Sequence, residues 1–149
     1  MPAVHIKTIR VAEDSIDVHE HVNNQEYLRW MQDAAIEHSS LQGWPMERYL
    51  ELGASWYVKS HFIEYLRPAL LADEILACTW VASMDRRTSL RQTVFLRCAD
   101  RQMLARAQTQ WIFVDLASGR PRAIPEAVRT AFATIASEDA ALAGILRPR

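Results

Sequence analysis

Residues 14–27 concentrate the groups of this chain whose types and spacing could perform acid–base chemistry. The segment holds carboxylates, two histidines and side-chain amides directly before a stretch whose pattern predicts a long helix. The first turn of a helix carries unpaired N–H groups and about half a positive charge, so it can hold a polarised carbonyl oxygen. A carboxylate a few residues upstream could then act on the same carbonyl group. An ordinary polar loop that caps a helix is the open alternative on the residues alone.

The helix that would position these groups is predicted over residues 25–42. Its apolar and small side chains recur at spacings of three and four, which is the pattern of a helix with one buried face. These side chains are Tyr27, Trp30, Met31, Ala34, Ala35, His38 and Leu41. Asn23 is a favourable N-cap, and Glu26 follows three residues later, as in a capping box. Gly43 is suited to end the helix.

Segments of alternating polarity predict an antiparallel sheet around this helix. The strands are expected at residues 4–11, 54–65, 74–84, 89–99 and 103–115. Short turns at 85–87 and 100–102 favour hairpins. One face of the second strand should carry Trp56, Val58 and Phe62. The fourth strand should have one apolar face, with Leu90, Val94, Leu96 and Cys98, and one polar face, with Arg91, Thr93 and Arg97.

One long helix and a meander of strands predict a single α+β domain over residues 1–149, with the sheet wrapped around the helix. Its core is expected at about residues 3–128. A last helix, started by Pro125, is expected at about 126–137 within a C-terminal helical tail of about 125–149. A five-stranded sheet has two exposed edges that invite pairing, so we expect a homodimer in which two sheets continue into one another.

The composition argues against several classes of protein. Half of the 149 residues are hydrophobic, 23% are charged and the net charge is −1, which is unlike a disordered chain, a fibre or a dedicated nucleic-acid binder. No stretch approaches the ~20 apolar residues that span a bilayer, and the N-terminal residues lack an apolar signal core. We therefore expect a cytoplasmic protein without membrane insertion.

Motifs of other common chemistries are missing from the sequence. The chain has four glycines and no GxGxxG, Walker, GxSxG or HExxH motif, so phosphate-loop, serine-hydrolase and zinc-hydrolase chemistry lacks support. Cys78 and Cys98 match no zinc spacing, and no metal site is predicted. Both thiols are expected to be unpaired and to act as small buried hydrophobes.

The segment Asp17-x-x-x-His21-Val22-Asn23-Asn24-x-x-Tyr27 resembles the signature loop of the hotdog-fold thioesterases, in particular the acyl-CoA thioesterases similar to 4-hydroxybenzoyl-CoA thioesterase. The likeness continues in residues 63–69, 73–74, 114–115 and 118–121 and covers about residues 6–128. It implies a hotdog fold, in which an antiparallel five-stranded sheet wraps around one long central helix. The implied order of elements agrees with the order expected from the sequence pattern.

The resemblance assigns roles to the matching positions. Asp17 falls on the family's catalytic carboxylate, which acts as a general base on water or attacks the thioester carbonyl; both roles remain open. The backbone N–H of Asn24 falls where the family polarises the thioester oxygen. His21 is expected to assist catalysis or to orient Asp17. Asn23 and Tyr27 are expected to contact substrate, with core packing as an equal alternative for Tyr27.

Further substrate contacts are expected outside the loop. The acyl chain should run along the helix between two subunits, against residues such as Trp30, Val58 and Phe62. Arg86 and Arg87 lie in a basic turn that would meet the phosphates of coenzyme A, since the planar guanidinium suits phosphate; a solvated turn is the alternative. Lys59 is a weaker candidate for the same role.

Some residues depart from the family pattern. Glu20 stands where the bacterial branch usually has glycine, which changes the freedom of the backbone and could raise the pKa of Asp17. Ser15 replaces an aspartate found in many relatives. His19 matches an amide position of the plant acyl-carrier-protein enzymes and stays a candidate. No His-Gly turn precedes Glu37, so a solvated helix residue is expected there.

These expectations combine into an acyl-CoA thioesterase that converts a fatty or aromatic acyl-CoA to the free acid and CoA. No cofactor is expected beyond the coenzyme A of the substrate. The alternatives are a thioesterase acting on acyl carrier protein and a non-catalytic acyl-CoA-binding hotdog protein; a hydratase or dehydratase would need a motif that is absent. The assembly is expected to be a homodimer or homotetramer, without a nucleic-acid partner.

Overall fold

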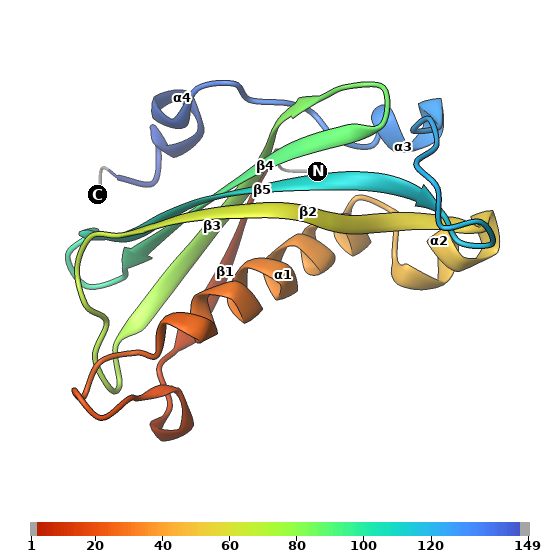
Figure 1. Cartoon of the computed structure of the whole chain (residues 1–149). Coiled ribbons are helices and arrows are strands. Elements are labelled where there is room, and N and C mark those ends of the chain that lie inside the picture. The colour runs from red at the N-terminus through yellow and green to blue at the C-terminus, as the bar shows by residue number, and fades with distance from the viewer. Residues whose placement is uncertain (1–2, 147–149) are drawn as a thin grey trace.

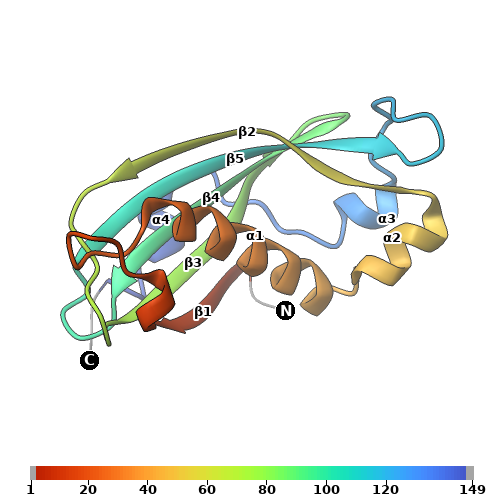
Figure 2. The same ribbon diagram turned by 60° about the horizontal axis from the view of Figure 1, so that its bottom comes forward.

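A five-stranded antiparallel sheet curves around one long helix in residues 3–146, the part of the chain that the computed structural model describes (Figure 1). The strands are β1 (Val4–Arg10), β2 (Ala54–Tyr65), β3 (Glu74–Met84), β4 (Thr88–Arg97) and β5 (Met103–Asp115), in the spatial order β1-β3-β4-β5-β2. The helix α1 (Asn24–Leu41) lies against the concave face of the sheet (Figure 2). The predicted α+β architecture is confirmed.

The start of α1 follows the predicted cap but not the predicted capping box. The Asn23 side chain accepts a hydrogen bond from the Gln25 N–H, as an N-cap should. The Asn23 N–H, however, donates to the Ser15 carbonyl oxygen at 2.7 Å, and the Glu26 carboxylate accepts from the Ser15 hydroxyl at 3.0 Å. The capping-box prediction is therefore wrong, because the Asn23 N–H and the Glu26 carboxylate each bond to Ser15 and not to one another. These bonds tie the preceding loop to the helix. Gly43 follows the helix with a φ of 94°, as expected of a terminating glycine.

Large side chains of α1 fill the space between its first half and the sheet. Tyr27, Trp30 and Met31 are at most 4% exposed and belong to one core cluster with Phe95 of β4. Complete burial of an apolar side chain of this size stabilises a fold by about 1.5–3 kcal/mol. The first half of α1 is thereby fixed rigidly on the sheet.

A second helix, α2 (Met46–Leu52), was not expected from the sequence. Pro45 precedes it, and Gly53 ends it in the left-handed region with a φ of 78°, so both boundary signals are present in the sequence. Its buried Tyr49 joins Trp44 and Phe113 in a second core cluster. The helix α2 follows the C-terminal end of α1 (Figure 2), so this cluster lies at that end of the long helix.

The helix predicted over 126–137 is wrong beyond its first turn. The helix α3 spans only Glu126–Arg129, and the chain then extends alongside β3. The Ile135 N–H donates to the Val81 carbonyl oxygen at 2.9 Å, so backbone pairing with the sheet replaces helical hydrogen bonds. The helix α4 (Glu138–Leu142) follows. No helix within residues 3–146 is long and apolar enough to cross a membrane.

The C-terminal segment covers the face of the sheet opposite α1 (Figure 1). Ala141 and Leu142 of α4 pack against Cys78 and Trp80 of β3 in a third core cluster. Both cysteines are free thiols. Cys78 is buried as expected, whereas Cys98 is only partly buried, so the expectation of burial is wrong for Cys98.

The C-terminal segment covers an apolar part of one face of β4, and Arg91 and Thr93 lie on the other face. Val94 and Leu96 belong to the cluster beneath the C-terminal segment, while Phe95 belongs to the cluster around α1. Arg91 and Thr93 share the face of Phe95, because side chains alternate along a strand. The alternation of β4 was predicted, but Arg91 and Thr93 point toward the helix and are buried.

The strand β2 forms one edge of the sheet and is interrupted by a bulge. Its pairing with β5 shifts register between Val58 and Ser60, which leaves Lys59 as the extra residue. Ile63 packs with the cluster around α1, so the neighbouring Phe62 faces away from the helix and is 60% exposed. Phe62 therefore does not share a face with Val58, contrary to the alternation read from the sequence.

Candidate active site

The loop before α1 folds into a tight turn that carries Asp17. Ile16 and Val22 pair as an isolated bridge, and the Asp17 N–H donates to the His21 carbonyl oxygen at 2.8 Å. Glu20 closes the turn with a φ of 64°, in the left-handed region that favours glycine. The residue that replaces the family's glycine thus keeps the glycine-like backbone conformation.

The carboxylate of Asp17 is oriented by the backbone of its own turn. Its Oδ1 accepts hydrogen bonds from the N–H groups of His19 at 2.9 Å and His21 at 3.2 Å. The bond from the His19 N–H is the largest of the causes that hold the pKa of Asp17 below its usual value of 3.8; desolvation opposes it, and the bond from the His21 N–H adds to it. The suggestion that Glu20 raises this pKa is wrong. Within residues 3–146, Oδ2 accepts no hydrogen bond and is open to a substrate.

The N–H of Asn24 is the first of α1 and has no acceptor among the described residues. It therefore offers the unpaired donor and positive end of a helix dipole that a polarised carbonyl oxygen requires. The Tyr65 hydroxyl donates to the Asn24 carbonyl oxygen at 3.3 Å, which joins the end of β2 to this first turn.

These groups converge on one cavity of about 300 Å³. Asp17, His21 and Asn24 line it from the loop and helix start, and Tyr27 lines it from the helix. Burial raises the pKa of Tyr27 to about 12, so its phenol stays neutral and cannot serve as a base. Tyr27 packs in the core and also lines the cavity, and its contact with substrate stays a prediction.

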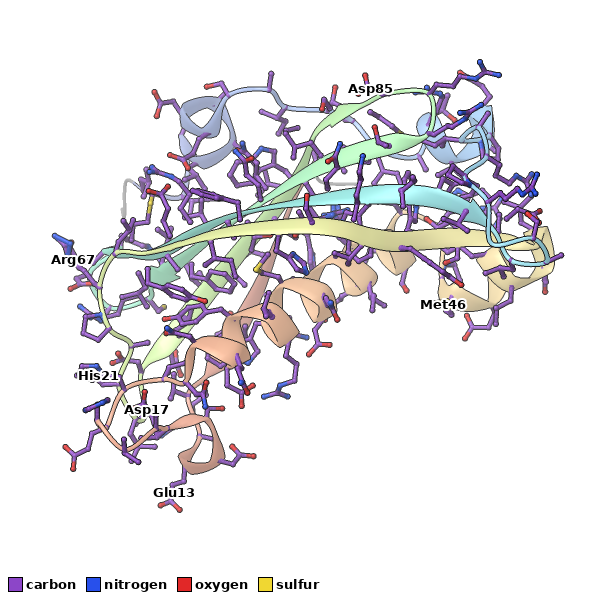
Figure 3. The ribbon with its side chains drawn as sticks, in the orientation of Figure 1. Glu13, Asp17, His21, Met46, Arg67 and Asp85 are labelled. Carbon is purple, nitrogen blue, oxygen red and sulfur yellow. The ribbon has the colours of Figure 1, made fainter. Side chains whose placement is uncertain are left out.

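The opposite wall of this cavity comes from residues 65–69, which connect β2 to β3. Arg67 lies there, on the same side of the molecule as Asp17 and His21 (Figure 3). The Val22 N–H donates to the Ala69 carbonyl oxygen at 2.9 Å and holds this connection against the loop. Sequence reasoning did not name Arg67 as a site residue, although the stretch around it carried part of the family resemblance.

Several residues expected at the substrate lie elsewhere in the chain. Asn23 caps α1 and does not line the cavity beside Asp17. Lys59 is the exposed bulge residue of β2. Arg86 and Arg87 are exposed in the turn between β3 and β4, whose neighbour Asp85 lies far from Asp17 (Figure 3). Contacts of Asn23, Lys59, Arg86 and Arg87 with the substrate stay predictions.

Of the three residues expected along the acyl chain, the structure places only Val58 at a cavity. Trp30 is enclosed in the core and Phe62 faces away from α1, so neither lines a cavity described here. The bulge at Lys59 explains Phe62, because one inserted residue reverses the faces of the rest of the strand.

A larger cavity of about 450 Å³ lies at the other end of α1. Its walls come from the second half of α1, from α2 and from the strands, and include Val58 and Met46. Met46 marks this end in Figure 3, far from Asp17 and His21. A volume of this size is typical of pockets for small organic ligands.

The remaining titratable residues near the loop form no metal site. Within residues 3–146, no group of three or more His, Cys, Asp and Glu side chains could hold a metal ion. His19 and Glu20 are exposed and line neither cavity. Glu37 keeps 40% of its side chain exposed, as expected of a solvated helix residue, and contacts His5 at 2.9 Å and Lys7 at 2.6 Å.

A five-stranded antiparallel sheet wrapped around one long helix, with Asp17 and Asn24 lining one cavity at the start of that helix, places the chain in the hotdog class of proteins. The chain belongs to the Thioesterase-like superfamily, whose family model matches residues 11–132. Membership identifies it as a thioester hydrolase, as the resemblance of the loop had implied.

Individual relatives support this assignment. The long-chain acyl-CoA thioesterase FadM of Escherichia coli K12 is 24% identical over 124 residues, which cover 81% of this chain and 91% of FadM. A 1,4-dihydroxy-2-naphthoyl-CoA thioesterase from Synechocystis superposes with a TM-score of 0.79 at 18% identity, covering 86% of this chain and 94% of that one. The hypothetical protein SAV2348 of Staphylococcus aureus, solved in complex with CoA, superposes with a TM-score of 0.82 at 16% identity, covering 89% and 87%. These superpositions demonstrate the shared fold.

Proposed function

We propose that this protein hydrolyses the thioester bond of an acyl-CoA, with Asp17 and the Asn24 N–H acting on the thioester group. The observation that carries the proposal is the shared cavity, in which an oriented carboxylate and an unpaired helix N–H stand on one wall. FadM is named for long-chain acyl-CoA and the Synechocystis neighbour for a naphthoyl-CoA, which supports coenzyme A as the carrier.

The Asn24 N–H stabilises the charge that develops on the thioester oxygen. As the carbonyl carbon becomes tetrahedral, negative charge moves to its oxygen, and a helix N–H fixed in place needs no reorganisation to bind it. The dipole of α1 adds to this effect, since its positive end faces the oxygen.

The free Oδ2 of Asp17 offers two routes to the products. As a general base, it takes a proton from a water molecule whose oxygen adds to the carbonyl carbon, and the tetrahedral intermediate then expels the thiolate of CoA. As a nucleophile, it adds to the carbonyl carbon itself, expels the thiolate and forms an anhydride that water hydrolyses. In both routes the thiolate gains a proton and the acyl group leaves as the free acid.

We infer that the active protein is a dimer formed along β2. This edge strand exposes Tyr57, Phe62 and Tyr65, each about half or more accessible. Exposed apolar side chains next to unpaired strand groups favour association with a second copy. Antiparallel pairing about the middle of β2 would set residues 54–58 of one chain beside 61–65 of its partner.

The decisive experiment measures release of free thiol from acyl-CoA substrates by the native protein and by Asp17→Asn. We expect kcat to fall about a thousandfold in Asp17→Asn, in the range that removal of a general base produces, with the fold unchanged by circular dichroism. Asp14→Asn is the matched control, because Asp14 is an exposed carboxylate of the same loop that lines neither cavity. Full activity of Asp17→Asn would refute the role of Asp17, and acyl-CoA binding by the native chain without thiol release would identify a binding protein.

A further inference from the structure

Arg91 is the one charged side chain among the described residues that line the larger cavity. It lies on β4 and is 6% exposed. No ion pair to a carboxylate is found for it within residues 3–146. A buried cation without a counter-ion is costly, so its position beside an open cavity calls for an explanation.

Neutral side chains hold one end of the Arg91 guanidinium. Its Nη1 donates to Nδ1 of His38 at 2.9 Å and to the Thr79 hydroxyl at 3.1 Å. His38 accepts through Nδ1, so that nitrogen carries no proton and the ring does not repel the cation. These bonds keep the guanidinium in one orientation between α1 and the sheet.

The other edge of the guanidinium is left for a ligand. Within residues 3–146, Nε and Nη2 of Arg91 make no hydrogen bond. These two nitrogens present parallel N–H groups, the arrangement that binds both oxygens of a carboxylate at once.

The neighbouring polar groups do not supply that acceptor. The Ser39 hydroxyl binds the Trp44 carbonyl oxygen and the Tyr49 hydroxyl, so both hydroxyls are engaged. Nε1 of Trp111, also a cavity-lining residue, is buried and has no acceptor among the described residues. Among the described residues, Nε and Nη2 of Arg91 thus remain without an acceptor, and most of the other cavity-lining side chains are apolar.

We propose that this cavity receives the far end of the acyl group and that Arg91 binds a carboxylate there, so that the favoured substrates are mono-CoA thioesters of dicarboxylic acids. The inference rests on the proposed acyl-CoA hydrolysis and specifies its substrate class. Burial lowers the pKa of Arg91 to about 10, so the side chain remains charged at neutral pH.

The cavity that serves a given catalytic loop belongs to the partner chain. Asn24 and Ile36 are separated by about 18 Å along α1, and the core cluster of Tyr27 and Trp30 occupies the path between them. Pairing of two β2 strands brings residues 54–58 of the partner, four of which line its cavity, beside the end of β2 that joins the loop of Asp17. The acyl group then runs from Asn24 of one chain toward Arg91 of the other.

The first test compares acyl-CoA pairs of equal chain length, with and without a terminal carboxylate, such as decanedioyl-CoA and decanoyl-CoA. We expect kcat/KM of the native protein to favour the dicarboxylic member of at least one pair about tenfold or more, the effect of one charge-assisted bidentate contact. Arg91→Met should remove this preference by lowering kcat/KM for decanedioyl-CoA at least about tenfold more than for decanoyl-CoA. Equal or better turnover of the plain acyl-CoA at every chain length, or an equal loss on both substrates in Arg91→Met, would overturn the proposal.

Product binding separates this inference from the hydrolase proposal and needs no variant. Decanedioic acid should raise the melting temperature of the native protein more than decanoic acid does at equal concentration, even if no thioester is cleaved. A larger shift with decanoic acid would contradict the role of Arg91. Loss of thiol release together with the expected product binding would instead contradict only the proposed hydrolysis.

Complementation tests which chain supplies Arg91. Mixing refolded Asp17→Asn and Arg91→Met chains creates dimers in which one site carries both changes and the other carries neither, if the cavity comes from the partner. Turnover of decanedioyl-CoA should then rise above that of either variant alone. Without such a rise in confirmed mixed dimers, the assignment of the cavity to the partner chain is wrong.

Discussion

The orientation of Asp17 has a consequence for the pH dependence of the reaction. Backbone N–H groups stabilise the ionised carboxylate, so its pKa lies below 3.8 and the active form persists as pH falls from neutrality. Activity due to this group is present above that pKa and is lost only when pH falls through it. We expect kcat/KM to show no acid limb down to about pH 5.

A pH–rate profile of the native protein checks this, with circular dichroism at each pH to show that the chain remains folded. An acid limb centred between about pH 5 and 7 in folded protein would identify a different essential base.

The backbone at Glu20 predicts a stabilising substitution. A non-glycine residue in the left-handed region costs roughly 1–2 kcal/mol, and Glu20 has a φ of 64° there. Glu20→Gly relieves this strain, but glycine also raises the conformational entropy of the unfolded chain. We therefore expect the free energy of unfolding to rise by only up to about 1 kcal/mol. Urea denaturation measures the change.

Glu20→Ala is the matched control, because it removes the same charge and keeps the strained conformation. If Glu20→Gly proves less stable than Glu20→Ala, strain at this position is not significant.

Sequence adjacency explains why the residues of the catalytic loop were predictable. Asp17, His21 and Asn24 lie within one turn and the helix start it leads to, so local structure alone brings them to one cavity. Arg91 was not predictable in this way. Its strand alternates as expected, but its burial depends on α1, whose His38 contacts Arg91 although the two residues are 53 positions apart in the sequence.

At the scale of elements, strands with clear alternation were predicted with accurate limits, and β2, β3 and β5 match their expected ranges. The failures share a cause. The segment after α3 has helical spacing but pairs with β3, because tertiary contact outweighs a weak local preference. In β2 a bulge interrupts the alternation, and no local signal announces it.

The cap of α1 provides a prediction for Asn23. Its side chain satisfies the Gln25 N–H and fixes the start of the helix, where the Asn24 N–H must point at the substrate. Asn23→Ala should lower the free energy of unfolding by about 1 kcal/mol, whereas Asn23→Ser, which can still cap, should lower it far less.

Denaturant titrations of both variants measure these changes in the free energy of unfolding. Equal destabilisation by alanine and serine would mean that capping does not explain Asn23, and its expected contact with substrate would then become the leading explanation.

At the scale of the molecule, we expect the two cavities to bind one substrate only when they come from two different chains of a dimer. One end of a chain carries Asp17 and Asn24, which we propose act on the thioester, and the other end has the larger cavity, which we propose receives the acyl group (Figure 3). An edge strand with exposed apolar side chains lies between them. Assembly and substrate choice are therefore expected to depend on the same strand.

Phe62→Glu tests this dependence directly. Phe62 is 60% exposed on β2, and burying it in a dimer would contribute about 1.5–3 kcal/mol per chain, so the charge should raise the dimer dissociation constant by at least about tenfold. Light scattering across a dilution series measures this constant, and thiol release at the same concentrations should fall in step with the dimer. Leu50→Glu is the matched control, since Leu50 is 59% exposed and belongs to α2, outside the strand proposed to pair. A Phe62→Glu chain that dimerises like the control, or that is monomeric and fully active, would exclude the β2 interface and with it a cavity shared between chains.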